Sequence, residues 1–257
     1  MKNLLLTFKK YHYFLYQLVK KDINLKYRSS YMGVLWTLLE PLLTMLVLML
    51  VFSRLYHNEK DFPVYILTGR LLYSFFANTT RNALKSIRNN SGMIKKVYVP
   101  KYMYPLACVL SGYIQFVISL IVLAGVMIYC KLPLTWHIVE AVVPLVVILI
   151  MTMGVGLWVS TLAVFFRDLE YLWGVALTLI MYACAIFYKV ETVIGENNEW
   201  LFRLNPLYSV IEVFRDAVYG NAMNVPVMLY SVLCSVVIFI SGVIVFYKNQ
   251  DKFVLHI

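Results

Sequence analysis

Residues 102–130 read YMYPLACVLSGYIQFVISLIVLAGVMIYC and contain no Asp, Glu, Lys or Arg. A helix that crosses a bilayer needs roughly 20 consecutive, mostly apolar residues. This stretch is longer than that requirement, so it predicts a membrane-spanning helix. The same test can be applied to the rest of the chain.

Five further stretches carry at most one charge each. Glu40 is the single charge of the first and Arg70 that of the second. With 61% hydrophobic and only 14% charged residues, the 257-residue chain lacks the polar surface that a soluble protein needs. We predict an all-α integral membrane protein, a single domain over residues 1–257 with six transmembrane helices. The five further stretches are residues 31–53, 62–80, 141–166, 171–188 and 225–247.

The basic residues indicate the orientation of this bundle. Sixteen of the 23 Lys and Arg lie in the N-terminal segment, in residues 81–101, at Arg167, or at Lys248 and Lys252. Basic flanks are retained in the cytoplasm, so both termini are predicted to be cytoplasmic. The net charge of +10 then reflects topology and contact with anionic lipid, and we expect no nucleic-acid partner.

Residues 1–30 have the pattern of an amphipathic helix. Phe14, Leu15 and Leu18 recur near helical spacing, while Lys20 and Lys21 fall largely elsewhere. This pattern predicts a helix that lies in the membrane interface. Such a helix is either a simple anchor or a lever that also touches a cytoplasmic partner.

Residues 81–101 read RNALKSIRNNSGMIKKVYVPK, with apolar side chains among the charges. A short helix with an apolar face would suit a groove on a cytoplasmic partner. The alternative is a basic cytoplasmic loop whose hydrophobic residues are incidental. The charged turn at residues 167–170 offers another cytoplasmic contact.

Residues 191–224 form the one long connection on the outer side. Apolar and charged residues alternate in it, and Asn205 and Pro206 interrupt it. We predict a re-entrant helical hairpin that dips into the outer leaflet, which requires cover by protein or water. An ordinary amphipathic loop is the alternative.

Inside the predicted spans, Glu40 and Arg70 are the only charges, and no paired carboxylates, His cluster or nucleophile triad appears. The chain is therefore predicted not to be an enzyme and to bind no metal. Arg70 either faces a water-filled path or pairs with Glu40. The deep aromatic residues Tyr73, Phe76 and Tyr182 either pack or contact sugar rings.

The sequence contains no GxxxxGK[S/T] stretch, the loop that cradles nucleotide phosphates. If ATP powers a process here, the ATPase is another polypeptide.

Several segments resemble, in chain order, the ABC-2 type permeases that export polysaccharides. Residues 26–42, KYRSSYMGVLWTLLEPL, resemble the opening signature of that family. Residues 94–107, IKKVYVPKYMYPLA, resemble its first coupling region, and residues 165–169, FFRDL, its turn between spans four and five. NPLY at 205–208 and FRDA at 214–217 resemble its outer re-entrant segment.

The resemblance implies a homodimer of this chain with two ATPase subunits in the bacterial cytoplasmic membrane. The cargo would be a glycan on an undecaprenyl diphosphate lipid, such as O-antigen, capsular polysaccharide or teichoic acid. It implies no cofactor on this chain, and ATP and Mg on the ATPase. A permease for a drug or lipid, or a membrane scaffold without transport, remains an alternative.

The resemblance also implies roles by position. The residues expected to contact the ATPase are Arg88, Lys95, Lys96, Tyr98, Arg167 and Asp168. The residues expected along the substrate path are Lys26, Arg28, Glu40, Arg70, Tyr73, Phe76 and Tyr182. The residues expected in the re-entrant segment are Asn205, Pro206, Arg215 and Asp216.

Overall fold

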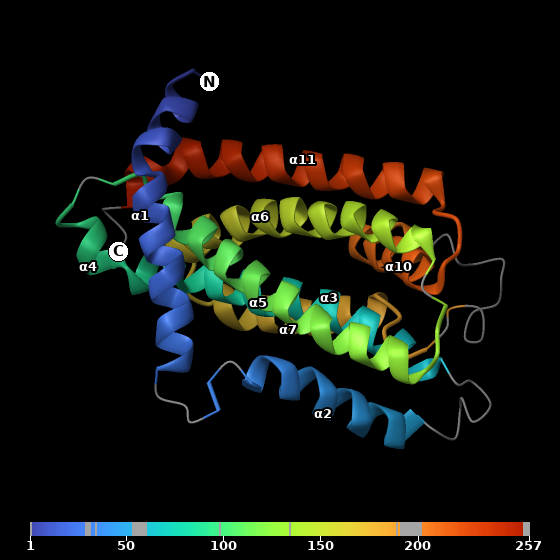
Figure 1. Ribbon diagram of the computed structural model, residues 1–257. Coiled ribbons are helices and arrows are strands. Elements are labelled where there is room, and N and C mark those ends of the chain that lie inside the picture. Colours follow the sequence, from blue (N-terminus) through green and yellow to red (C-terminus); the bar gives the residue numbers. More distant parts are fainter. Residues whose placement is uncertain are drawn as a thin grey trace.

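A computed structural model shows how the helices of the chain are arranged (Figure 1). It describes residues 2–28, 32–33, 35–52, 61–97, 99–133, 135–188, 190 and 202–253, with side chains from residue 11 onward. Throughout these residues the regular structure is helical, and no strand occurs in them. The predicted all-α class is therefore confirmed.

Nine α-helices and two short 3₁₀ helices make up the described elements. They are α1 (Lys2–Tyr27), α2 (Leu35–Phe52), α3 (Phe62–Asn89), α4 (Ser91–Ile94), α5 (Met103–Tyr129), η1 (Trp136–Ala141), α6 (Val142–Phe165), α7 (Leu169–Ala183), α10 (Pro206–Tyr219), α11 (Val225–Asn249) and η3 (Gln250–Lys252).

Four of the described helical segments are long and apolar enough to cross a membrane. They are Leu35–Phe52, Met103–Tyr129, Trp136–Phe165 and Val225–Lys252. These segments match four of the six predicted spans. The other two predicted spans fall on α7, a shorter apolar helix, and on α3, which contains more polar residues.

The helix α3 lies at the centre of the bundle. It contacts α2, α5, α6, α7 and α10, and most of its residues up to Ile87 are buried. It also continues to Asn89, beyond the end at residue 80 that hydropathy predicts for this span, because Ala83, Leu84 and Lys85 favour helix. Residues 81–89, expected in a cytoplasmic loop, are therefore the last turns of a bundle helix, and only α4 follows before α5.

The helix α1 runs across one end of the bundle, while α3, α5, α6, α7 and α11 extend away from that end (Figure 1). Its side chains Leu15, Leu18 and Val19 are buried, and the ring of Phe14 meets Tyr104 of α5 edge-on at 6.1 Å. One apolar face of α1 thus packs on the bundle, as its amphipathic sequence requires.

The helices α6 and α11 pack closely because each has a glycine where they cross. A Cβ atom at Gly154 would lie 2.6 Å from the Cα of Phe239, and one at Gly242 would lie 2.5 Å from the carbonyl oxygen of Gly154. Small residues at such contacts are typical of helix pairs in membranes, where packing replaces the hydrophobic effect.

Candidate functional site

A cavity of about 780 Å³ lies between α1, α2, α3 and α5. Most of the side chains around it are polar or charged, although the surrounding helices are largely apolar. The polar and charged lining residues are Lys21, Asp22, Lys26, Thr37, Glu40, Thr44, Arg70, Ser74, Asn78, Thr79, Arg81, Asn82, Lys85, Ser86, Asn89, Asn90, Ser111, Gln115 and Ser119.

Basic side chains outnumber acidic ones in this lining. The basic residues are Lys21, Lys26, Arg70, Arg81 and Lys85, and the acidic residues are Asp22 and Glu40. Burial raises the pKa of Asp22, an effect that Lys21 partly opposes, so the negative charge of this carboxylate is disfavoured. The cavity is therefore cationic.

One face of α3 supplies the longest polar surface of the cavity. Arg70, Ser74, Asn78, Arg81 and Lys85 recur at intervals of three or four residues, the spacing of a single helix face. The opposite faces of α3 carry the apolar residues of the core. This division lets a helix with many polar groups sit at the centre of the bundle.

Arg70 reaches the cavity near the first third of α3. Among the described residues its one side-chain hydrogen bond runs from Nη1 to the sulfur of Met181, at 4.0 Å. Within the described part of the chain no carboxylate lies at ion-pair distance from it, so the pairing with Glu40, left open by the sequence, does not form here. Arginine carries five N–H donors, which leaves most of those of Arg70 to the cavity.

The other residues predicted for the substrate path divide into two groups. Lys26 and Glu40 line the cavity, and the ammonium of Lys26 donates to the side-chain oxygen of Gln115 at 2.5 Å. Tyr73 and Phe76 are buried in the core, where the hydroxyl of Tyr73 donates to the carbonyl of Leu177 at 2.7 Å.

Two further residues predicted for the path are exposed and do not line the cavity. Arg28 follows the end of α1, and Tyr182 is exposed on α7. A sugar-facing role for Tyr73, Phe76 and Tyr182 stays a prediction.

A second arginine, Arg215 of α10, is buried with 7% exposure. Its guanidinium lies 3.6 Å from the ring centroid of Tyr65 and donates to the carbonyls of Tyr65 at 3.2 Å and Ala185 at 3.4 Å. A Cβ atom at Gly69 would lie 2.7 Å from its Nη2. Gly69 therefore leaves the space that this guanidinium fills.

The ends of α10 follow from its sequence. The side chain of Asn205 accepts from the backbone N–H of Leu207 at 3.1 Å, Pro206 opens the helix, and Gly220 ends it at a φ of 76°. The amide of Asn205 also donates to the carbonyl of Ala183 at 3.3 Å, which links α10 to the end of α7. Residues 191–201 of the predicted hairpin lie outside the described residues.

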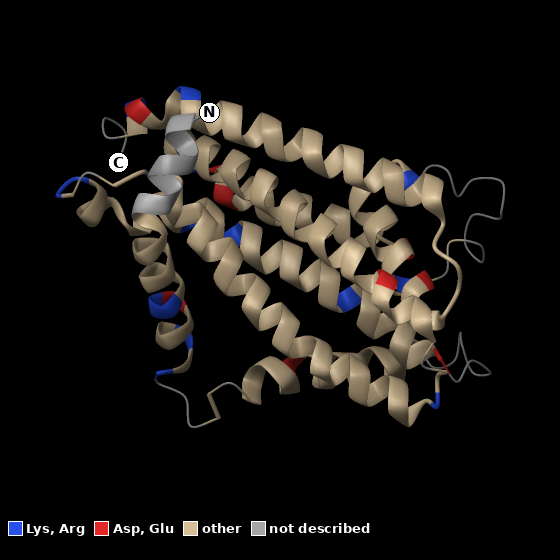
Figure 2. Ribbon diagram, turned by 45° about the horizontal axis from the view of Figure 1, so that its top comes forward, with Lys and Arg blue, Asp and Glu red and all other residues tan. Residues whose placement is uncertain are grey.

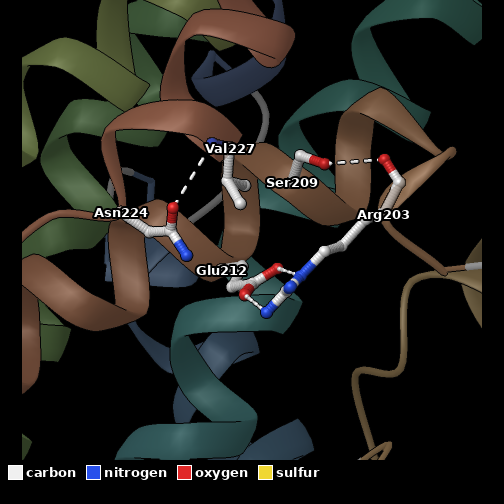
Figure 3. A network of polar contacts seen from close by, with 5 residues as sticks. All are labelled: Arg203, Ser209, Glu212, Asn224 and Val227. Carbon is white, nitrogen blue, oxygen red and sulfur yellow. Dashed lines mark hydrogen bonds and ion pairs between the residues drawn. The ribbon is translucent and has the colours of Figure 1, made fainter. Parts of the chain in front are cut away.

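A polar network fixes the chain around α10 (Figure 3). Arg203 donates to both carboxylate oxygens of Glu212, at 2.9 and 3.4 Å, and its carbonyl accepts from Ser209 at 3.0 Å. Asp216 lies on the same helix. Burial, and secondarily the charge of Glu212, raises the pKa of Asp216 to about 6, while Arg203 opposes the shift.

Most of the residues predicted from sequence to contact the ATPase lie near the C-terminal end of α3 or in the short segments that follow α3 and α6. The carboxylate of Glu170 forms ion pairs with Lys85 and with Arg88, the latter at 3.7 Å. Lys95, Lys96, Arg167 and Asp168 are exposed, and Tyr98 lies outside the described residues. Much of the ribbon coloured blue for Lys and Arg lies at the end of the bundle that holds α1, α4 and the end of α11 (Figure 2).

Sequence reasoning missed part of the cavity. Ser74, Asn78 and Gln115 lie within predicted spans, where no site role is expected for them, and Arg81 lies in the predicted cytoplasmic loop. The signal was present in the three- and four-residue spacing of these polar residues from Arg70 onward. Counting charges along the chain conceals it, because such a count ignores the side of the helix on which each residue lies.

Similarity to known proteins extends over nearly the whole chain. An O-antigen export system permease protein, RfbA, of Klebsiella pneumoniae is 28% identical over 241 residues, which cover 92% of each chain. RfbA of Myxococcus xanthus is 28% identical over 248 residues and 95% of each chain. The polysialic acid transport protein KpsM of Escherichia coli is 22% identical over 250 residues, 91% of this chain and 92% of KpsM.

The family described as ABC-2 type transporter matches residues 13–219. This region extends from α1 to the end of α10 and includes every helix that lines the cavity. The match covers well over half of the chain and agrees with the resemblance drawn from residues 26–42 and the later segments. The chain therefore belongs to the ABC-2 type transporter family.

Proposed function

We propose that this chain is the permease subunit of an ATP-driven exporter that moves a polysaccharide, such as O-antigen or capsular glycan, across the bacterial cytoplasmic membrane. The observation that supports it most is the similarity along nine-tenths of each chain to permeases named for O-antigen and polysialic acid. A polar cavity among apolar helices is what the passage of such a cargo requires.

The proposed topology has six spans, the four apolar segments together with α3 and α7. The helix α3 can lie at membrane depth because its polar face meets the cavity and its neighbours cover the rest. The helix α1 lies in the cytoplasmic interface, and α10 forms the inner arm of an outer re-entrant hairpin. Both termini are then cytoplasmic, in agreement with the basic residues at that end.

ATP and Mg bind to a separate ATPase subunit in this proposal, and the permease is a homodimer. The exposed side chains of Lys95, Lys96, Arg167 and Asp168 are the proposed contacts with the ATPase. The ion pairs of Glu170 link the segment that follows Arg167 to the end of α3. A displacement of this surface by the ATPase would therefore be transmitted to the wall of the cavity. The cargo is proposed to be linked to undecaprenyl diphosphate.

The deciding experiment is deletion of the gene, followed by extraction of surface glycans and complementation. We expect a high-molecular-weight glycan to disappear from the surface and to return with the wild-type chain. An unchanged surface glycan profile would favour the alternative, a permease for a drug or lipid, and would refute the proposal.

A second experiment tests the coupling surface. Reversing the charges of Lys95 and Lys96 to Glu should lower co-purification of the ATPase while the chain still inserts into the membrane. The matched control reverses Lys248 and Lys252 near the C-terminus, which should leave co-purification intact. If the Lys95 and Lys96 reversal has no effect on co-purification or export, this surface is not the contact.

A further inference from the structure

The cations of the cavity are too widely spaced along α3 to serve one small anion. Arg81 follows Arg70 by eleven residues, which is three helical turns, so the two side chains start from the same face about 16 Å apart. Lys85 lies one turn further along that face and forms an ion pair with Glu170. A ligand that meets both arginines must therefore carry anionic groups at separate points along its length.

Arg70 in particular has no ion-pair partner among the residues that the structure describes. Its recorded contact is the sulfur of Met181, and within the described part of the chain no carboxylate lies at ion-pair distance. A guanidinium inside a membrane bundle is costly unless water or a ligand satisfies it. Carboxylate and phosphate groups match its planar array of donors better than a neutral hydroxyl does.

Between the two arginines the cavity offers neutral groups that bind hydroxyls. Ser74 and Asn78 lie on α3 between Arg70 and Arg81, and Gln115 of α5, whose amide oxygen accepts from Lys26, lines the same cavity. Amide and hydroxyl side chains both donate and accept hydrogen bonds, as sugar hydroxyls do. The lining thus alternates sites for anions with sites for hydroxyls.

From this arrangement we infer that the cavity binds an acidic polysaccharide, with Arg70 and Arg81 contacting carboxylate or phosphate groups of the polymer. The inference rests on the proposed function and adds the chemical class of the cargo. Arg70 and Arg81 are then residues that determine specificity. Lys21 and Lys26, from α1 at the inner end, add to the attraction of the cavity for anions.

The binding test uses the full chain in lipid nanodiscs and two labelled oligomers of equal length. One is an oligogalacturonate, and the other is its fully methyl-esterified, uncharged form. We expect the acidic oligomer to bind about tenfold more tightly than the ester. Arg70→Gln and Arg81→Gln should each weaken binding of the acid several-fold without changing binding of the ester, whereas Arg70→Lys should retain most of it.

The matched control is Lys248→Gln, which removes one exposed positive charge outside the cavity and should leave both affinities unchanged. Equal binding of acid and ester, or equal weakening of both by Arg70→Gln, would overturn the inference. So would complete displacement of the acidic oligomer by inorganic diphosphate at matched concentration, because the cavity would then be a diphosphate site. Each variant should first elute as the same species as wild type with an unchanged Tm.

The glycan that disappears in the deletion strain supplies an independent test. We expect it to contain uronic acid, another carboxylated sugar, or phosphate in its repeating unit. A neutral polymer would overturn the inference and leave the proposed function intact. If no glycan disappears, the proposed function fails and the inference fails with it, whatever the binding data show.

Discussion

Arg70 and Arg215 are the same side chain in two opposite settings. Arg215 is buried, stacks on Tyr65 and donates to two backbone carbonyls, whereas Arg70 borders a cavity and, among the described residues, donates only to the sulfur of Met181. Within the described residues neither is paired with a carboxylate. Both terminal nitrogens of Arg215 donate to backbone carbonyls, whereas most of the donors of Arg70 are open to the cavity.

The contrast shows why charge inside a helical bundle has no single meaning. A guanidinium that bridges α10, α3 and the turn after α7 holds these elements together. A guanidinium that borders a polar cavity is expected to add little to stability, and we propose that its role is binding. Mutation can separate the two roles, because the first predicts a loss of stability and the second a loss of affinity.

The largest effect is expected from Arg215→Ala. It removes the donors to the carbonyls of Tyr65 and Ala185 and the contact with the Tyr65 ring, and it leaves a void. We expect a loss of about 2–4 kcal/mol in stability. The measurement is thermal unfolding of the purified protein, with a fall in Tm of roughly 5–10 °C.

Arg215→Lys sharpens this test. Lysine keeps the charge but lacks the planar group that lies against Tyr65 and reaches two carbonyls at once, so it should recover only part of the loss. Full recovery would show that charge alone matters, and the proposed role of the stacked guanidinium would be wrong.

Gly69→Ala should cause the next largest loss of stability. The added methyl group would lie 2.7 Å from Nη2 of Arg215 and 3.3 Å from Cγ2 of Ile186, so the guanidinium must move from its carbonyls. Overpacking of this kind costs about 1–3 kcal/mol. Combined with Arg215→Ala, which empties the space, the same change should cost much less, and a double-mutant cycle on Tm measures that coupling.

Gly174→Ala is the matched control, because it makes the same change within α7 at a position with nothing within 4 Å of the new Cβ. It should leave Tm unchanged or raise it slightly, since alanine favours helix. If Gly69→Ala is as harmless as this control, then Arg215 is not held as tightly as described.

Hydropathy located the apolar helices but not the two arginine sites. The uncharged residues 102–130 correspond closely to α5, because length and composition suffice to define a helix that could cross a membrane. The end of α3 was predicted too early, because a rule that counts charges stops at Arg81 whereas helix propensity does not. The cavity depends on how α1 and α2 pack beside α3 and α5, which no single helix encodes.

The role of Arg215 was hidden for a similar reason. In an amphipathic segment a charged residue is expected on the solvated face, and nothing local marks it as buried. Its position depends on the missing side chain at Gly69 and on two carbonyls distant in sequence. The cap residues Asn205 and Pro206, by contrast, act locally, and the interruption that the sequence shows at them is where α10 begins.

A smaller, pH-dependent effect is expected at Asp216, on α10 beside Arg215. Burial and Glu212 raise its pKa to about 6, so its charged form is disfavoured in the folded protein. As pH falls from 7.5 through 6 toward 4, the folded state takes up this proton before the unfolded state does, and stability should rise. After discounting for its exposed half, the gain is about 1 kcal/mol.

Asp216→Asn should therefore be more stable than wild type at pH 7.5 and should lose this part of the slope of Tm against pH. Asp168→Asn, which removes a carboxylate from an exposed turn, controls for the change in net charge. A slope unaltered by Asp216→Asn, or a wild-type protein that loses stability relative to the variant on acidification, would contradict the assignment.

The smallest effect on stability is expected at Arg70. Arg70→Gln gives up only the 4.0 Å contact with Met181 and leaves no carboxylate of the described chain unpaired, so the change should lie within about 0.5 kcal/mol. Arg215→Gln is the direct comparison, because the same substitution at the buried site should be costly. A Tm loss at Arg70 equal to that at Arg215 would make both arginines structural and remove the distinction between them. An unchanged Tm of Arg70→Gln together with weakened binding of the acidic oligomer would assign Arg70 to binding and Arg215 to stability. A charged side chain inside the bundle that does not stabilise the fold is then explained by the ligand that it binds in the cavity.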